Sequence, residues 1–211
     1  MALAPVLPER LSAGSYLSLC ATYLGGFDDV SGEVWVQPEP NNGGWGAGQG
    51  IDGASGLIAT VDGDTYNYPV ELVESKVPLL VEQYSLNTQA SGGDGQWRGG
   101  IGCIREYRTL GKKTFFHASM GRNRVRPWGM KGGSAGTNNY VEIEWPGNKE
   151  VEIATRVANV PLPKGSRVRI ITGRGGGYGD PKERPTEQVR EDVRNGYITE
   201  EQANQVYGVT L

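Results

Sequence analysis

The segment Arg174-Gly-Gly-Gly-Tyr-Gly-Asp-Pro-Lys-Glu-Arg184 places four glycines among five residues and closes them with an Asp-Pro pair. Glycine loses the most backbone entropy on ordering, so such a run is typical of places where the chain needs left-handed angles or a close approach. It follows a strand-like stretch, 166–172, and precedes a predicted helix start, where unpaired amides can bind an anion. Two interpretations stay open: a tight connector packed under the C-terminal helix, or a ligand-binding loop.

Short apolar and aromatic runs, separated by turn residues, occupy most of the remaining chain. The 33 glycines and 12 prolines among 211 residues exceed usual usage, but hydrophobic residues still make up 37%. The pattern predicts a mostly β (α+β) fold of antiparallel sheets connected by glycine-rich turns. The predicted strands are 16–23, 33–37, 56–61, 79–86, 101–109, 114–120, 140–145, 151–157 and 168–172.

Two turns are predicted to form hairpins between the strands that flank them. One is Leu110-Gly-Lys-Lys113 and the other is Pro146-Gly-Asn-Lys149. Short loops that contain glycine between apolar runs are typical of such connections.

Helix is predicted only near the end of the chain. Thr186 is placed to cap a helix over 187–194. The sequence Thr199-Glu-Glu-Gln202 is a capping-box pattern that opens a second short helix. We therefore expect a β-rich region over 1–184 and a helical tail over 185–211, which packs on that region or on a partner.

Simple features argue against several protein classes. The longest apolar runs, such as Val77–Val81, are too short to span a bilayer. The first ten residues lack a basic region and contain prolines, so no signal peptide is predicted. Cys20 and Cys103 are too few for a disulfide framework and are expected to be buried free thiols. A cytoplasmic protein is expected.

Charge is distributed unevenly along the chain. Residues 1–97 carry 2 basic and 12 acidic side chains, whereas residues 98–131 carry 9 basic and 1 acidic side chain. This asymmetry could form an anion site or a partner surface, but pairing between the two segments is favoured. A net charge of −3 and the absence of a recognised motif argue against nucleic-acid binding.

Two carboxylates near Pro69 are candidate catalytic residues. Glu71 and Glu74 would share a face on a helical turn, but not on a strand. Paired carboxylates can share a proton or hold a basic group. The alternative is a salt bridge to Arg98 or Arg105.

The loop Asp94-Gly-Gln-Trp-Arg-Gly-Gly100 supplies two more candidate catalytic residues, Asp94 and Arg98. Glycine on both sides of Arg98 allows the backbone to approach a ligand. Its guanidinium offers a planar fork for a carboxylate or phosphate. A structural clamp across the loop is the favoured alternative.

A second arginine-rich segment, Arg122-Asn-Arg-Val-Arg126, would place three guanidinium groups on one face if it were extended. Trp128 follows closely and could stack on one of them. The segment is interpreted as an interface or scaffold.

Metal and nucleotide chemistry find little support in this sequence. His117 is the single histidine and lies in an apolar run, whereas a zinc or manganese site needs several ligands. We therefore expect a structural histidine and no complete metal site. Phosphate-loop, dinucleotide and Gly-x-Ser-x-Gly motifs are absent, so ATP, if used, is held elsewhere.

Several segments, in order along the chain, resemble the hydantoinase B/oxoprolinase family, in its C-terminal part. They are Asn67–Glu71 with Glu74, Ser91–Gly100, Arg124–Gly136, the glycine run of 174–179, and Val189–Ile198. The colinear order over nearly the whole chain makes the resemblance more specific than any one glycine motif.

The resemblance implies a B-type subunit of an ATP-dependent enzyme, a group that includes N-methylhydantoinases, 5-oxoprolinase, and acetone and acetophenone carboxylases. An A-type partner that holds ATP and Mg phosphorylates the carbonyl or enol oxygen of a small-molecule substrate. The B-type part then hydrolyses a cyclic amide or carboxylates a ketone. The implied partners are the A-type subunit and an N-terminal B-type chain, with no nucleic acid or membrane.

This sequence departs from the family pattern in length. Family chains carry an N-terminal, His- and Asp-containing stretch associated with a divalent metal, zinc or manganese, and that stretch is missing here. The expectation is a chain that binds no cofactor and is inactive alone, as a split gene product or a truncation. It would either complete an active site, with Glu71, Glu74, Asp94 and Arg98 nearest the chemistry, or serve as an architectural subunit. An independent binding module is the third hypothesis.

Overall fold

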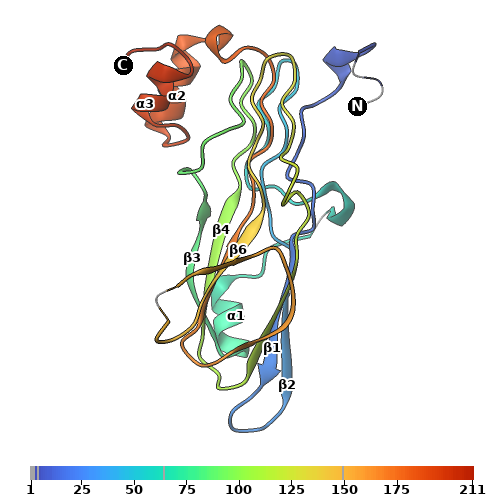
Figure 1. Cartoon of the computed structure of the whole chain (residues 1–211), viewed down its shortest axis with the longest axis vertical. Coiled ribbons are helices and arrows are strands. Elements are labelled where there is room, and N and C mark those ends of the chain that lie inside the picture. Colours follow the sequence, from blue (N-terminus) through green and yellow to red (C-terminus); the bar gives the residue numbers. More distant parts are fainter. Residues whose placement is uncertain (1–2, 4, 64, 149) are drawn as a thin grey trace.

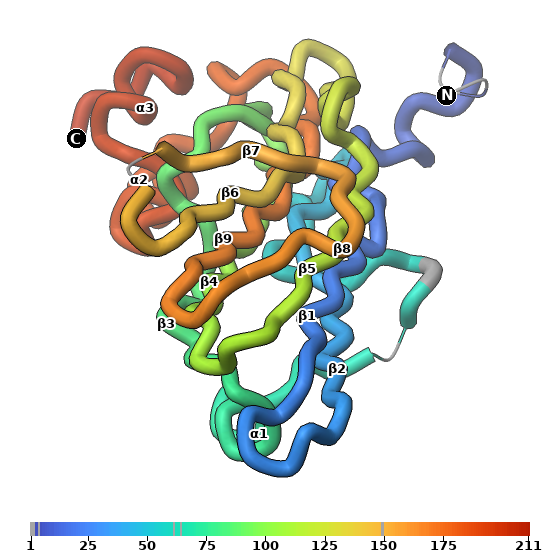
Figure 2. Tube along the Cα trace, turned by 60° about the horizontal axis from the view of Figure 1, so that its bottom comes forward, coloured from blue at the N-terminus to red at the C-terminus, as the bar shows by residue number. Residues whose placement is uncertain are grey.

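The computed structural model of the chain describes residue 3 and residues 5–63, 65–148 and 150–211. Its two antiparallel sheets have the strand orders β2-β1-β5-β8 and β3-β4-β9-β6-β7 (Figure 2). The strands are β1 (Ala21–Phe27), β2 (Val34–Glu39), β3 (Leu79–Leu86), β4 (Cys103–Thr109), β5 (Thr114–Ser119), β6 (Tyr140–Glu144), β7 (Glu152–Ala154), β8 (Arg156–Leu162) and β9 (Arg167–Ile171). The predicted mostly β, antiparallel fold is confirmed.

The hydrophobic core lies between the two sheets. Leu24 and Phe116 of the first sheet belong to one buried cluster with Tyr107, Ile143 and Val168 of the second. Alternation along each strand directs these side chains to the inner face of its sheet. The sheets therefore form a sandwich, and this part of the fold follows from strand periodicity.

An ion pair inside the sandwich also joins the sheets. Glu39 of β2 and Arg105 of β4 are both buried and form this pair. The Tyr107 hydroxyl donates a 3.3 Å hydrogen bond to Glu39. The Glu39–Arg105, Asp52–Arg98 and Glu82–Arg108 pairs all join the acidic first segment to the basic middle segment. This is the pairing that the charge distribution predicted.

One predicted hairpin is wrong and the other is confirmed. The turn at 110–113 does not pair its flanking strands, because β4 enters the five-stranded sheet and β5 the four-stranded sheet. That turn crosses from one layer of the sandwich to the other. β6 and β7 do form a hairpin, with Val141 opposite Ala154; Lys149 of its turn lies outside the described residues.

The helices are short; α2 (Thr186–Arg194) and α3 (Glu200–Gln205) lie at the upper end of the view in Figure 1, and α1 (Val70–Lys76) lies in its lower half. α1 was not predicted, and Val73 anchors it in the core. α2 and α3 form the predicted tail. Three short 3-10 helices, η1 (Pro8–Arg10), η2 (Thr60–Asp62) and η3 (Pro181–Glu183), complete the elements, and η2 ends the segment predicted as strand 56–61.

The tail has its own small apolar cluster. Val189, Ile198, Ala203, Tyr207 and Val209 are all buried together between α2 and α3. The capping box predicted at Thr199 is confirmed, with reciprocal hydrogen bonds between Thr199 and Gln202. No helix in the part of the chain described here is long and apolar enough to span a membrane.

Extended glycine-rich segments run side by side between the sheets and the tail (Figure 1). We call them the glycine bundle: residues 13–16, 43–47, 52–56, 93–102, 127–137 and 173–179. Backbone contacts hold it together, because an added Cβ at Gly175 would fall on the Trp45 carbonyl and one at Gly176 on the Trp128 carbonyl. The glycines are required for this close backbone packing.

The run 173–179 lies at the centre of the bundle and uses all of its amides internally. Each of its seven backbone N–H groups donates to a protein acceptor. The acceptors, in order, are Asn139 Oδ1, Thr137 Oγ1, Gly100 O, Gly14 O, Ser134 O, Trp97 O and Met130 O. No amide of 173–179 is left for an anion, which favours the connector interpretation over a ligand-binding loop for this run.

Candidate functional site

A cluster of three buried charges and one partly exposed carboxylate joins the glycine bundle to the tail. We call the four residues Asp52, Arg98, Arg184 and Asp192 the charge cluster. Asp52 and Arg98 come from two loops of the bundle, Arg184 follows η3, and Asp192 lies on α2. Sequence separations of up to 132 residues connect its members, so the cluster exists only in the folded chain.

Arg184 makes the strongest contacts in the charge cluster. Its Nη1 and Nη2 atoms donate 2.8 Å hydrogen bonds to the two carboxylate oxygens of Asp52. Nη2 also lies 2.8 Å from Oδ2 of Asp192. A bidentate guanidinium–carboxylate pair fixes both distance and orientation, so Arg184 holds the start of the tail against the loop that contains Asp52.

Arg98 contacts the same two carboxylates. Its Nε donates a 3.3 Å hydrogen bond to Oδ1 of Asp192, and its backbone N–H donates a 2.7 Å bond to Asp52. The guanidinium also lies over the Tyr197 ring, 4.8 Å from its centroid. Arg98 is therefore a clamp between the loop and the tail.

Electrostatics in the cluster favour its charged form. Burial would raise the pKa of the Asp52 carboxyl, but hydrogen bonds and charge from Arg184 hold that pKa below its usual range. Burial would lower the pKa of Arg184, but Asp52 and Asp192 raise it. Asp52 and Arg184 both stay charged, because the attraction and hydrogen bonds between them outweigh the cost of removing each charge from water.

A third arginine lies next to the cluster without a carboxylate partner among the described residues. The Arg174 side chain donates to the Ala90 carbonyl at 2.6 Å and to the Tyr197 carbonyl at 3.0 Å. Burial, and then the charge of Arg98, lower its pKa. Arg174 therefore also ties the bundle to the tail, by carbonyl contacts.

Asp94, the other candidate of this loop, contacts both the bundle and the tail. Its Oδ2 accepts a 3.0 Å hydrogen bond from the Ser134 hydroxyl, and its Oδ1 accepts a 3.4 Å bond from the Tyr207 hydroxyl. Burial, and then the charge of Asp94, raise the pKa of Tyr207. The structure brings Asp94 and Arg98 into one region, as polar links between bundle and tail.

Glu71 and Glu74 lie elsewhere, on α1 in the lower half of the view in Figure 1, whereas α2 and α3 lie at its upper end. Both are exposed. They occupy one helical turn, as the shared-face alternative required, and Glu74 accepts a 2.9 Å hydrogen bond from the backbone N–H of Val81. Among the described residues neither pairs with Arg98 or Arg105, because those arginines bind the carboxylates described above.

The other residues weighed from the sequence have structural roles. Arg122 has a left-handed backbone, so its segment is not extended, and it stacks 4.9 Å from the Trp128 ring as expected. His117 accepts a 3.1 Å hydrogen bond from the backbone N–H of Asn159. Cys20 and Cys103 are buried free thiols.

The charged groups of the cluster bind one another, so their role is to hold the glycine bundle and the tail together. Every charged group in it faces an opposite charge, and the Arg98, Arg184 and Asp192 side chains are less than 10% exposed. Within the described residues no three His, Cys, Asp or Glu side chains gather to bind a metal.

Sequence reasoning missed Asp52, Arg184 and Asp192. A usable signal existed for Asp192, because it follows Val189 by three residues on α2 and so shares its buried face. A carboxylate on the apolar face of a helix indicates a buried cation partner. No comparable local signal marks Asp52, which lies in a loop.

Comparisons with known proteins identify the family. The family model described as hydantoinase B/oxoprolinase matches residues 1–181. The candidate B subunit of a D-/L-hydantoinase from Pseudomonas sp. (strain NS671) is 36% identical over all of this chain and 35% of its own length. The beta subunit of the caprolactamase from Pseudomonas jessenii is 33% identical over 80% of this chain and 29% of its own length.

Solved structures share the fold. The crystal structure of the ATP-dependent caprolactamase from Pseudomonas jessenii matches all of this chain and 37% of its own, with 27% identity and a TM-score of 0.79. A nucleotide-free acetone carboxylase matches 99% of this chain and 32% of its own, with 22% identity and a TM-score of 0.78. This chain thus spans about a third of the length of these relatives, and it belongs to the hydantoinase B/oxoprolinase family.

Proposed function

We propose that this chain is a portion of the B-type subunit of an ATP-dependent, hetero-oligomeric enzyme of the hydantoinase/oxoprolinase type. An A-type partner phosphorylates the carbonyl or enol oxygen of a small substrate. The B-type part then hydrolyses the activated cyclic amide or carboxylates the activated ketone. Phosphorylation helps because it converts an inert amide or enolate oxygen into a leaving group.

The observation that carries this proposal is the match to components of such enzymes, over all of this chain in one relative and over two thirds or more of it in two others. The relatives that align with this chain are named as the B subunit of a hydantoinase, the beta subunit of a caprolactamase and the alpha subunit of an acetone carboxylase. Their names contain both hydrolases of cyclic amides and a carboxylase, so the proposal keeps both reaction types.

The cofactors of the proposed enzyme lie on other polypeptides. ATP and Mg belong to the A-type partner. A divalent metal, zinc or manganese, belongs to the B-type polypeptide that corresponds to the part of the relatives outside this match. We place the assembled enzyme in the cytoplasm.

The four candidate residues divide into two roles in the proposal. Asp94 and Arg98 act as positioning residues, because their polar atoms hold the tail against the glycine bundle. Glu71 and Glu74 are the candidates for substrate contact, because both are exposed and form no ion pair within the described residues.

The charge cluster also favours a second role, that of a non-catalytic architectural subunit. Its guanidinium groups are occupied by Asp52 and Asp192, and the amides of 173–179 are all bonded internally. Under this alternative the chain contributes surfaces to the complex while another chain supplies every reacting group.

An assay on the complex, purified through a tag on this chain, tests the proposal. We expect ATP hydrolysis that depends on a hydantoin, a lactam or a ketone, and that is lost when this chain is withdrawn. A Glu71→Gln/Glu74→Gln double variant that abolishes turnover in an intact complex supports catalysis, whereas full turnover supports the architectural role. ATP hydrolysis that no such substrate stimulates would contradict the proposal.

A further inference from the structure

The outward face of the four-stranded sheet is apolar, like its inward face. Antiparallel sheets with one solvated face normally alternate apolar and polar residues. Here the outward positions of all four strands are mostly apolar. They are Ala21, Tyr23, Gly25, Phe27, Val34, Val36, Pro38, Phe115, His117, Ser119, Arg156, Ala158 and Pro161. We call this set the open face.

The open face is exposed in this chain. Val34 is 70% exposed, Val36 57%, Tyr23 47% and Phe27 43%. The strand register places these side chains next to one another, since Gly25 lies opposite Val36 and Phe27 opposite Val34. Contiguous apolar surface of this kind marks an interaction site in a soluble protein.

The five-stranded sheet provides an internal comparison, because its outward face carries alternating charges. Glu106 of β4 pairs with Arg167 and Arg169 of β9 at 2.5 and 3.5 Å. Glu142 and Glu144 of β6 pair with the same two arginines at 3.4 and 2.9 Å. The outer face of the five-stranded sheet is thus charged and suited to contact with water, whereas the outer face of the four-stranded sheet is mostly apolar.

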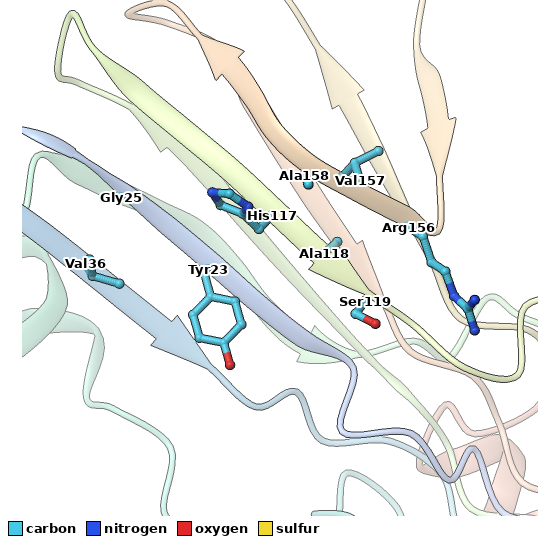
Figure 3. A pocket seen from close by; sticks show the side chains of 9 residues that line it. All are labelled: Tyr23, Gly25, Val36, His117, Ala118, Ser119, Arg156, Val157 and Ala158. Atoms are coloured by element: carbon cyan, nitrogen blue, oxygen red, sulfur yellow. The ribbon is translucent and has the colours of Figure 1, made fainter.

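A hollow of about 680 Å³ lies in the middle of the open face (Figure 3). Val36, Tyr23 and His117 line it from the neighbouring strands β2, β1 and β5, and Gly25 forms part of its floor. A Cβ at Gly25 would meet the Trp35 carbonyl at 3.2 Å, whereas a Cβ at Gly26 would fall directly on the Lys113 carbonyl. Contacts within this chain therefore require glycine at position 26, and the absence of a side chain at Gly25 leaves the floor of the hollow open.

Charge on the open face argues against a second copy as its occupant. The face contains Arg156 at one corner and no acidic residue. No ion pair of Arg156 is found in the part of the chain that the structure describes. The open face of a second copy would offer no carboxylate to Arg156, so an apolar partner that brings its own acidic group fits the face better.

We propose that the open face is the docking surface for the B-type polypeptide that corresponds to the part of the relatives this chain does not span. This inference rests on the proposed function. In the caprolactamase structure, the region that matches this chain makes up 37% of a longer chain. The rest of that longer chain is available to cover the equivalent sheet. A side chain of the occupant fills the hollow over Gly25, and an acidic side chain faces Arg156.

Photo-crosslinking in the complex tests the docking surface. A p-benzoylphenylalanine placed at Val36 probes the open face, and one placed at Leu80, exposed on β3, is the matched control. We expect Val36 to crosslink to the B-type polypeptide, identified by peptide mass spectrometry, and Leu80 not to. Crosslinks from Val36 only to a second copy of this chain, or to an A-type chain, would overturn the inference.

Charge substitutions provide a second readout of the same surface. Val36→Lys should weaken capture of the B-type polypeptide about tenfold or more, while Leu80→Lys leaves it unchanged. Val36 is exposed, so both variants should melt at the wild-type temperature; the crosslinking result decides if one does not. Undiminished capture by a folded Val36→Lys variant would overturn the inference.

The two proposals fail in distinguishable ways. If the B-type polypeptide co-purifies but neither Val36 readout responds, the docking surface is wrong and the proposed function stands. If no B-type polypeptide co-purifies with the wild-type chain, both proposals fall.

Discussion

Arg184 and Asp52 are joined by two hydrogen bonds of 2.8 Å each, across 132 residues of sequence. This pair fixes the chain just before α2 to a loop of the glycine bundle. Asp192 then ties α2 itself to Arg184 and Arg98. The tail is therefore held by a few buried charges in addition to its own apolar cluster.

Removing the Asp192 charge should loosen the tail. We expect Asp192→Asn to lower the free energy of unfolding by about 3 kcal/mol, because two buried guanidinium groups lose a shared partner. Urea unfolding measures the change, and hydrogen exchange over 186–209 locates it. The control, Glu191→Gln, alters an exposed neighbour and should change stability by less than about 0.5 kcal/mol. Equal effects of the two substitutions would contradict the clamp.

The Asp52 pair should give stability a defined pH dependence. The folded-state pKa of Asp52 lies below its ordinary value of 3.8. Its contribution is therefore fully present above pH about 4 and is lost as pH falls through the folded pKa. The stability difference between wild type and Asp52→Asn should be constant from pH 7 to about 4.5 and shrink below 3.8. A difference that grew with acidification would contradict this sign.

The glycine bundle should reject even one methyl group. Gly176→Ala would place its Cβ on the Trp128 carbonyl, and backbone cannot move aside as a flexible side chain can. We expect a loss of about 3 kcal/mol or more, seen as a lower melting temperature or as insoluble protein. Gly63→Ala, with nothing within 4 Å of the added Cβ, is the control and should melt like wild type. A well-folded Gly176→Ala variant would show that the backbones are less tightly packed.

The two thiols should be unreactive in the folded chain. Burial raises the pKa of Cys20 to about 12 and that of Cys103 to about 11, from an ordinary 9.0. The thiolate is the reactive form, so at pH 8 a disulfide reagent should react slowly with native protein. Two thiols per chain should appear on unfolding. Rapid titration of either thiol under native conditions would contradict the packing around it.

Local sequence signals were enough where local physics decides the structure. The capping box at Thr199 formed as predicted, because its hydrogen bonds join residues three apart. The β6–β7 hairpin formed because a short turn joins two strands that are neighbours in the sequence. The turn after β4 was misjudged, since a turn determines the reversal of the chain but not which sheet the next strand joins.

The glycine bundle and the charge cluster could not be predicted from local features. Glycine segments carry no side-chain periodicity, so nothing in 173–179 indicates its neighbours at 13–16 or 127–137. Arg98 was recognised as important, but its partner Asp192 lies 94 residues away. The sequence supported a clamp at Arg98 without showing what it clamps.

The most direct test of the account is native mass spectrometry of the complex purified through a tag on this chain, with metal analysis of the same sample. We predict an assembly that contains an A-type chain and a further B-type polypeptide, with bound zinc or manganese. A lone, metal-free species of 22.7 kDa would contradict the account.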